Sequence, residues 1–290
     1  MKGASIALLS LFALASSAFA SPATAPIPET LTWTGAVNTD WYNAGNWSGA
    51  HAPDGDDHAI IANTGVTASI TGSTPTIGRL TVQSGATVHL SNVGLIVSGD
   101  VDLLGTMTSS TTGDRLDCSG DLNVTATASY QAGGELIELN GAGTMSISSG
   151  ATPSPRVRVV SGARSCGSAT VSEFYLAGGT FELSDNSTLT VNGPANMQAG
   201  VLNFATVGGN FETIDVNGDW LLSGTVLGTT STQSRVYVSG DWLANTPFSM
   251  ANGNVYLDGG DADIKGTMPE FHRVQLTSGV KTLMTDVSIT

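Results

Sequence analysis

The chain has 290 residues, of which 12% are charged and 6% aromatic, and 36 are glycine. Ten Lys and Arg residues against 24 Asp and Glu residues give a formal net charge of −14. The scarcity of charged helix formers argues against a helical enzyme domain, and the scarcity of cations argues against nucleic acid or an anionic membrane as a partner, because both are bound through clustered Lys and Arg.

The first twenty residues have the pattern of a secretory signal peptide. Lys2 precedes an apolar stretch at residues 6–15, and Ala18-Phe19-Ala20 forms a small-x-small cleavage site. The apolar stretch is too short for a membrane-spanning helix, which needs about 20 residues. We therefore expect residues 1–20 to be removed on export to the cell surface or the extracellular space, with no membrane insertion within this chain. Residues 21–30 are rich in proline and form an extended linker.

Residues 31–75 are rich in tryptophan, and we expect them to cap the repeats that follow. Asp54, Asp56 and Asp57 form the densest acidic group of the chain, beside Gly55. Carboxylates in a glycine-containing loop are typical ligands of Ca²⁺, so a calcium site is an alternative here to a plain acidic turn. The sequence indicates no other cofactor.

A short phrase, apolar-x-apolar-x-Gly, recurs roughly every 21 residues within residues 76–290. The positions two and four residues before the glycine are apolar in every copy, with Arg158 as the exception, whereas the position between them varies. This alternation is typical of a β-strand with one buried face. The phrases end at Gly99, Gly120, Gly141, Gly162, Gly193, Gly218, Gly240 and Gly259.

One such strand cannot bury its apolar face alone, so neighbouring copies must stack. The phrase returns in the same order after a full coil, which predicts an all-β parallel β-solenoid with coils of roughly 21 residues; a β-sandwich is the alternative. The glycine is expected to supply a positive φ at each turn. The gap between Gly162 and Gly193 contains a partial copy, residues 174–178, and predicts a divergent or looped-out coil.

Aspartate follows several of the glycines, at Asp100, Asp121, Asp219 and Asp241. Hydrogen bonding of each carboxylate to nearby backbone N–H groups is favoured over a calcium-binding ladder, because few of these copies are consecutive.

Cys118 and Cys166 are the only cysteines and therefore the only pair that could form a disulfide. Cys118 occupies an inward position of its coil, and Cys166 lies about two coils further along the chain. Two stacking steps separate Cα atoms by about 9–10 Å, which exceeds the ~7 Å limit for a disulfide. We therefore favour no disulfide and expect a buried free thiol at Cys118.

Aromatic residues recur at equivalent positions of neighbouring copies. Trp220 and Trp242 lie 22 residues apart, and Tyr237 and Tyr256 lie 19 apart. Stacked rings of this kind form platforms for sugar rings, which makes these four residues the candidate carbohydrate-binding site. The alternative is that the tryptophans fill a corner of the core and the tyrosines only stack on a face.

The sequence shows no catalytic constellation, and we expect a protein that is not an enzyme. Arg156, Arg158 and Arg164 form the only basic cluster, interpreted as a solvated loop or a small anion-binding patch. Paired acids for glycoside hydrolysis lie roughly 5–10 Å apart. Candidate pairs close in sequence are Glu135/Glu138, Asp215/Asp219 and Asp261/Asp263, and we interpret each as surface solvation.

Two groups of short motifs resemble those of a known family. The first group is Trp33-Thr34-Gly35, Asp40-Trp41 and Gly45-Asn46-Trp47-Ser48, and the second is Gly218-Asp219-Trp220 and Gly240-Asp241-Trp242. The chain resembles bacterial secreted or cell-surface parallel β-helix repeat proteins of the adhesin-like and autotransporter-passenger-like kind. This resemblance covers most of residues 31–290 and implies a right-handed β-helix outside the cell, with no catalytic residues to transfer.

These observations predict a non-enzymatic structural or adhesive segment of a bacterial surface protein. The alternatives are a carbohydrate-binding β-solenoid and a polysaccharide lyase or glycoside hydrolase of the β-helix type. Extracellular glycans or the surface of a host or neighbouring cell are the expected partners. Because the last residues read as the middle of a coil, we expect the chain to be a fragment with further coils downstream.

Overall fold

The computed structural model describes residues 27–131, 136–151, 153–205, 211–224, 226–227, 233–246, 249–266, 270–284 and 288–289. The predicted signal peptide and the linker up to residue 26 lie outside these residues. The one helix described is the 3₁₀ helix η1 (Ala44–Asn46). No helix in these ranges is long and apolar enough to cross a membrane.

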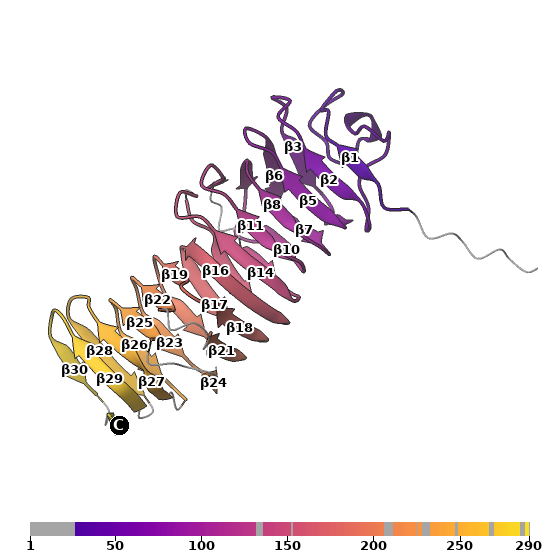
Figure 1. The fold of residues 1–290 in the computed structure, drawn as a ribbon. Coiled ribbons are helices and arrows are strands. Elements are labelled where there is room, and N and C mark those ends of the chain that lie inside the picture. Colours follow the sequence, from indigo (N-terminus) through magenta and orange to yellow (C-terminus); the bar gives the residue numbers. More distant parts are fainter. Residues whose placement is uncertain are drawn as a thin grey trace, which may run out of the picture.

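Parallel strands stack coil upon coil into an elongated rod (Figure 1). The described strands form three sheets, which we call the first, second and third. The second sheet runs along the whole rod and contains β4 (Thr76–Ile77), β7 (Gly94–Val97), β10 (Arg115–Cys118), β13 (Leu136–Leu139), β15 (Arg156–Val159), β17 (Glu173–Leu176), β20 (Ala195–Met197), β23 (Trp220–Leu222), β26 (Trp242–Ala244), β28 (Ala262–Gly266) and β30 (Lys281–Leu283).

The first sheet lies across the core from the second. Its main path contains β1 (Thr30–Thr32), β2 (His58–Ile61), β5 (Arg79–Val82), β8 (Val101–Leu103), β11 (Leu122–Val124), β14 (Gly143–Ile147), β16 (Ala163–Val171), β19 (Thr188–Val191), β22 (Thr213–Val216), β25 (Arg235–Val238), β27 (Ser249–Leu257), β29 (Glu270–Leu276) and β31 (Ser288–Ile289). A side branch of the same sheet contains β18 (Thr180–Leu183), β21 (Val201–Phe204) and β24 (Val226–Leu227).

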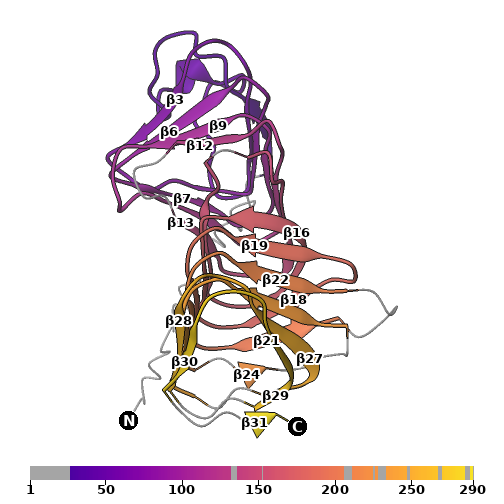
Figure 2. The same cartoon turned by 90° about the vertical axis from the view of Figure 1, so that its left-hand side faces the viewer.

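The third sheet is short and closes only the N-terminal coils. It contains β3 (Ala68–Thr71), β6 (Thr87–Ser91), β9 (Thr106–Ser109) and β12 (Ser129–Gln131). Figure 2 shows it at one end of the rod, whereas the side branch β18–β21–β24 lies towards the other end. Strands β1, β2 and β3 fall within residues 31–75 or overlap them, so the tryptophan-rich segment contributes strands to the solenoid as well as covering its end.

The predicted parallel β-solenoid is confirmed, because every pairing between named strands is parallel and links one coil to the next. A β-sandwich would require antiparallel pairs. In most strands alternate residues point inward and are fully buried, as in β13, β15 and β17. The alternation seen in the sequence is therefore the alternation between core and surface.

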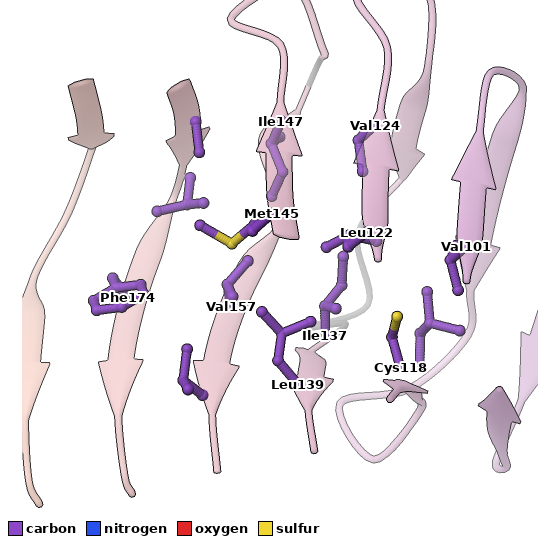
Figure 3. Packing of buried hydrophobic residues seen from close by; sticks show 14 of the residues in the cluster. Val101, Cys118, Leu122, Val124, Ile137, Leu139, Met145, Ile147, Val157 and Phe174 are labelled. Carbon is purple, nitrogen blue, oxygen red and sulfur yellow. The ribbon is translucent and has the colours of Figure 1, made fainter. Parts of the chain in front are cut away.

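Like residues stack on like residues in the core (Figure 3). Leu116, Ile137, Val157 and Phe174 are register partners on successive second-sheet strands, and each has 0% exposure. Full burial of one such side chain stabilises the fold by about 1.5–3 kcal/mol. Because neighbouring coils share this ladder, no coil can bury its apolar face without the next.

The recurring glycines are needed for close packing, and the prediction of a positive φ at each turn was wrong for most of them. Gly120 and Gly218 have ordinary backbone angles. A Cβ on Gly120 would lie 2.5 Å from the carbonyl carbon of Gly99 in the coil before it, and one on Gly218 would lie 2.6 Å from that of Gly193. Glycine stands at these corners because backbone packs directly on backbone there.

The repeated phrase changes corner along the rod. Gly99, Gly120 and Gly141 follow strands of the second sheet, whereas Gly193 and Gly218 follow strands of the first sheet. The gap between the two series is therefore not a looped-out coil. Residues 173–176 form β17, an ordinary second-sheet strand paired with both β15 and β20.

Arg158 appeared as an exception because the copy ending at Gly162 has one extra residue between strand and glycine. The inward residues of β15 are Val157 and Val159, and Arg158 points outward between them.

The coils change shape around β16. On one side this nine-residue strand pairs with β14 across a register shift; on the other, its first half pairs with β18 and its second half with β19. Arg164, in the first half of β16, is 1% exposed, and its guanidinium donates to the carbonyl oxygens of Gly120 and Cys118, the latter at 2.9 Å. These acceptors lie 44 and 46 residues earlier, two coils back. Gly143 leaves room for the Arg164 side chain, since a Cβ on residue 143 would lie 2.9 Å from the guanidinium.

Aspartates at the corners bond from coil to coil, which confirms their predicted role in hydrogen bonding to the backbone. The N–H of Asp121 donates to Asp100 Oδ1 at 2.9 Å, and the N–H of Thr144 donates to Asp121 Oδ1 at 2.7 Å. The same contact joins Asp241 to Asp219 at 2.9 Å. Each carboxylate thus fixes the start of the strand in the following coil.

The N-terminal end of the stack is covered by three buried tryptophans. The rings of Trp33 and Trp41 each meet that of Trp47 edge to face, at 5.2 and 4.8 Å between centroids. The buried side chain of Asn46 accepts from the N–H groups of Val37 and Asn38, at 2.9 and 3.1 Å. The loop is therefore an ordered cover over the first coil, as a solenoid end requires.

Candidate functional site

One line of outward-facing residues follows the second sheet from β7 to β28. Successive members are register partners on neighbouring strands, so each lies one coil beyond the last. We call this line the outer row; it consists of Ile96, Asp117, Glu138, Arg158, Tyr175, Asn196, Leu221, Leu243 and Lys265.

The N-terminal part of the outer row is a closed charge network. Arg115 Nε lies 3.1 Å from Asp117 Oδ2, and Arg158 Nη1 lies 3.1 Å from Glu138 Oε1. The side chains of Asp117 and Glu138 are only 8% and 13% exposed. Burial raises the pKa of Asp117, and the positive charge of Arg115 opposes this rise. Because both carboxylates are covered and paired with guanidinium groups, this network fixes the two arginines in place.

Tyr175 is the centre of a second polar group one strand further on. Its hydroxyl donates to Glu173 Oε2 at 2.5 Å, and Arg156 Nε donates to the same oxygen at 3.1 Å. Burial raises the pKa of the Tyr175 hydroxyl, with a smaller contribution from Glu173. The phenol is thus a neutral, oriented group at the surface of the sheet.

Two open hollows adjoin one another along the outer row. The first has a volume of about 300 Å³ and is lined by Leu136, Arg156, Arg158, Tyr175 and Gln198. The second has a volume of about 420 Å³ and is lined by Asn196, Leu221, Leu222, Ser223, Leu243, Asn245, Lys265 and Gly266. They meet at β20, which carries Asn196 and is followed directly by Gln198. Together they form a polar and apolar trough along the rod.

The tryptophans predicted to bind sugar do not reach the surface. Trp220 and Trp242 stack at 5.4 Å between centroids, but they are 0% and 1% exposed and point into the core. The prediction of a sugar platform was therefore wrong for this pair, and the core-filling alternative is correct. Their inward neighbours on the same strands are the aliphatic residues Leu222 and Ala244.

The predicted tyrosines do face outward, on the first sheet. Tyr237 and Tyr256 are half-buried register partners whose rings stack at 4.4 Å between centroids with 10° between planes. Each ring uses one face on the other, so the pair offers edges and hydroxyl groups rather than a broad platform for sugar rings. Asp215 precedes them in the same line, and burial raises the pKa of its carboxyl group, with the charge of Asp258 adding to the effect.

The basic cluster of the sequence is divided by the fold. Arg156 and Arg158 lie side by side on β15 and line the first hollow, whereas Arg164 is buried at the first sheet. The interpretation of this cluster as a solvated loop was therefore wrong, since all three residues lie on strands and Arg164 is buried, and the anion-binding alternative fails for the three together.

Among the candidate acid pairs, Asp215 faces outward while Asp219 accepts an N–H at a corner. Asp263 pairs with Lys265, and Asp261 accepts the N–H of Val280. Glu135 lies outside the described residues.

The acidic group proposed for calcium forms a turn. Asp57 is 3% exposed, and its two oxygens accept the N–H groups of Glu29 and Asp54 at 2.9 and 3.0 Å. Asp54 and Asp56 are exposed. In the ranges that the structure describes, no three His, Cys, Asp or Glu side chains come together to hold a metal ion.

Both cysteines are free and buried, on different sheets. The thiol of Cys118 donates to the carbonyl oxygens of Gly120 and Gly99 at 3.4 and 3.7 Å. Burial raises the pKa of Cys118 to about 11 and that of Cys166 to about 12. Both thiols are therefore protonated at neutral pH and serve as small core residues.

Residues 32–114 match a family described as a domain of unknown function (DUF8693). This stretch runs from the tryptophan-rich cover into the coils closed by the third sheet. No curated protein and no solved structure matches the chain.

Proposed function

We propose that this chain is a non-enzymatic structural and adhesive segment of a bacterial surface protein. The observation that carries the proposal is the continuous rod, in which a uniform core supports a line of varied side chains along one face. A molecule of this kind acts through geometry, because it holds a contact surface at a fixed distance from its point of attachment.

The stacking contacts explain why such a rod is stiff. Backbone hydrogen bonds, buried ladders and corner glycines all join one coil to the next, so bending the rod would separate several contacts at once. The acidic surface supports the same role, since a net charge of −14 keeps a long molecule soluble and separate from its copies.

The proposal also rests on the leader-like start of the sequence. Lys2, the apolar stretch at residues 6–15 and Ala18-Phe19-Ala20 form the three parts of a secretory signal. Export from a bacterial cell is the setting in which an adhesive rod can meet its partner.

Expression of the chain in a bacterial host, followed by cell fractionation and mass spectrometry, tests export. We expect a product that starts at Ser21 outside the cytoplasm. When Ala18 and Ala20 are both changed to Glu, we expect the product to keep residues 1–20, because the cleavage site is lost. An uncleaved product that stays in the cytoplasm would overturn the proposal. Attachment of cells displaying the chain to coated surfaces, compared with cells lacking it, tests adhesion directly.

Carbohydrate binding is the second candidate function. The specific observation in its favour is the pair of hollows along the outer row, with amide, phenol and aliphatic side chains on their walls. Ligand sites of this composition hold small polar molecules by a few oriented groups over an apolar floor.

A further inference from the structure

We propose that the outer row from Arg158 to Lys265, with the two hollows beside it, binds an extended, neutral polysaccharide. This inference rests on the proposed function and names the partner that an adhesive rod would hold. It places binding on the second sheet rather than at the tyrosine pair of the first.

The spacing of the row suits a linear polymer. Arg158, Tyr175, Asn196, Leu221, Leu243 and Lys265 lie on six successive strands. Adjacent strands are about 4.8 Å apart, so the row offers one contact for each such step along the rod. A sugar unit in an extended chain advances by a similar distance, which allows consecutive sugars to meet consecutive strands.

The polar groups on the walls are available to a ligand. Asn196, Gln198 and Asn245 form no side-chain hydrogen bond within the described part of the protein, and all three line the hollows. A carboxamide both donates and accepts, and therefore matches a hydroxyl group, which does the same. Three unused carboxamides in one trough favour a ligand rich in hydroxyl groups.

The charges favour a neutral ligand over an acidic one. Arg158 is paired with Glu138 at 3.1 Å, Arg156 with Glu173 at 3.1 Å and Lys265 with Asp263 at 2.5 Å. Each cation beside the trough is thus already neutralised by a carboxylate of the protein. A polymer of uronic acids would meet those carboxylates as well as a strongly acidic molecule.

The apolar floor and the sheet geometry favour a sugar chain over a peptide strand. Leu221 and Leu243 are half-buried neighbours in the second hollow and offer a surface for the C–H faces of sugar rings. An added peptide strand would instead need free backbone groups at a sheet edge. The trough lies on a sheet face, where the backbone groups of β20, β23 and β26 pair with neighbouring strands.

Affinity electrophoresis of the purified chain tests the proposal. Native gels would contain glucomannan, xyloglucan or amylose as neutral polymers, and polygalacturonate or alginate as acidic ones. We expect at least one neutral polymer, and neither acidic one, to retard the protein. Calorimetry with oligosaccharides of the retarding polymer should show affinity rising with length up to about six sugars, since the row spans six strands.

Variants locate the site. Asn196→Ala and Gln198→Ala should each weaken binding about five-fold, the effect of losing one neutral hydrogen bond. Tyr237→Ala and Asn123→Ala change the outer face of the first sheet and should leave binding unchanged. Thermal unfolding of each variant checks that the fold is kept.

Two results would overturn the inference: retardation by acidic polymers only or by none, and loss of binding in Tyr237→Ala with retention in Asn196→Ala. Export and glycan binding are separate measurements. An exported chain that binds no neutral polymer would refute the inference and leave the surface role standing, whereas a binding chain kept in the cytoplasm would do the reverse.

Discussion

The coils on either side of β14–β17 bury the same kind of core but close their corners differently. In the first region, residues 58–139, the third side of the coil is a separate sheet, and the stacked glycines follow strands of the second sheet. In the second region, residues 173–283, a further glycine stack follows strands of the first sheet, beginning at Gly193. The inward ladder continues through both regions.

This difference shows which parts of a coil are exchangeable. A coil needs an apolar ladder and at least one corner where backbone meets backbone, but the corner that carries the recurring glycine phrase can change along one chain. The outer row is unaffected by the change because it belongs to the second sheet, which both regions share.

The largest effect is expected from the core of the second region. Trp220→Ala should lower the free energy of unfolding by about 3–5 kcal/mol, because it removes a fully buried ring. Tyr237→Ala, on the outward face, should lower it by about 1 kcal/mol. Urea unfolding of both variants measures the contrast. Equal losses would show that the inward and outward assignments of the two aromatic pairs are wrong.

The junction between the regions is broken most directly at Arg164. Arg164→Met keeps a similar volume but removes the buried guanidinium that donates to the carbonyl groups of Gly120 and Cys118, and should cost about 2–3 kcal/mol. Gly143→Ala should destabilise the same place, since its Cβ would meet the guanidinium. Denaturant titration measures both, and a more stable Arg164→Met would show that burial of the charge outweighs its bonds.

The two glycine stacks can be compared by adding one methyl group to each. Gly120→Ala and Gly218→Ala should each cost about 1–3 kcal/mol, because the new Cβ would meet the backbone of the preceding coil. Gly113→Ala is the matched control, since no atom lies within 4 Å of its Cβ position. Thermal melts of the three variants would show whether both corners are equally close-packed, and a control as damaging as the others would contradict this explanation.

The smallest effect is expected at the aspartate corners, and it depends on pH. The N–H of Thr144 lowers the pKa of Asp121, so the folded carboxylate contributes stability above the unfolded pKa and loses it as pH falls through the folded value. Because Asp121 is exposed, Asp121→Asn should cost less than about 1 kcal/mol at pH 7. The difference from the parent chain should vanish in acid. Stability measured from pH 7 to pH 2 tests this, and a difference that grows in acid would reverse the sign.

The sequence was sufficient for the fold because alternation of buried and exposed residues has the same period as the strand. Leu116 and Ile137 could be placed inward from that pattern alone. Stacking of the coils followed because one such strand cannot bury its apolar face alone.

The outer row was missed because alignment on the recurring glycine joined residues of two different faces. Asp117 and Glu138 precede their glycine on the second sheet, whereas Tyr237 and Tyr256 precede theirs on the first. Only the strand pairing in the structure shows that the outer row passes from Glu138 to Arg158 and then to Tyr175. The sequence did contain one signal of this error, because Arg158 occupied a position that is apolar in the other copies. Shifting the phrase by one residue at Gly162 would have placed Arg158 on the outer face.

The bonds from Arg164 also join coils that are not neighbours. Its acceptors, the carbonyl groups of Cys118 and Gly120, lie 46 and 44 residues earlier, whereas each strand pairing links a coil only to the next one. Separating the coils between β10 and β16 would therefore break a buried contact that spans two coils as well as the pairing of neighbouring strands.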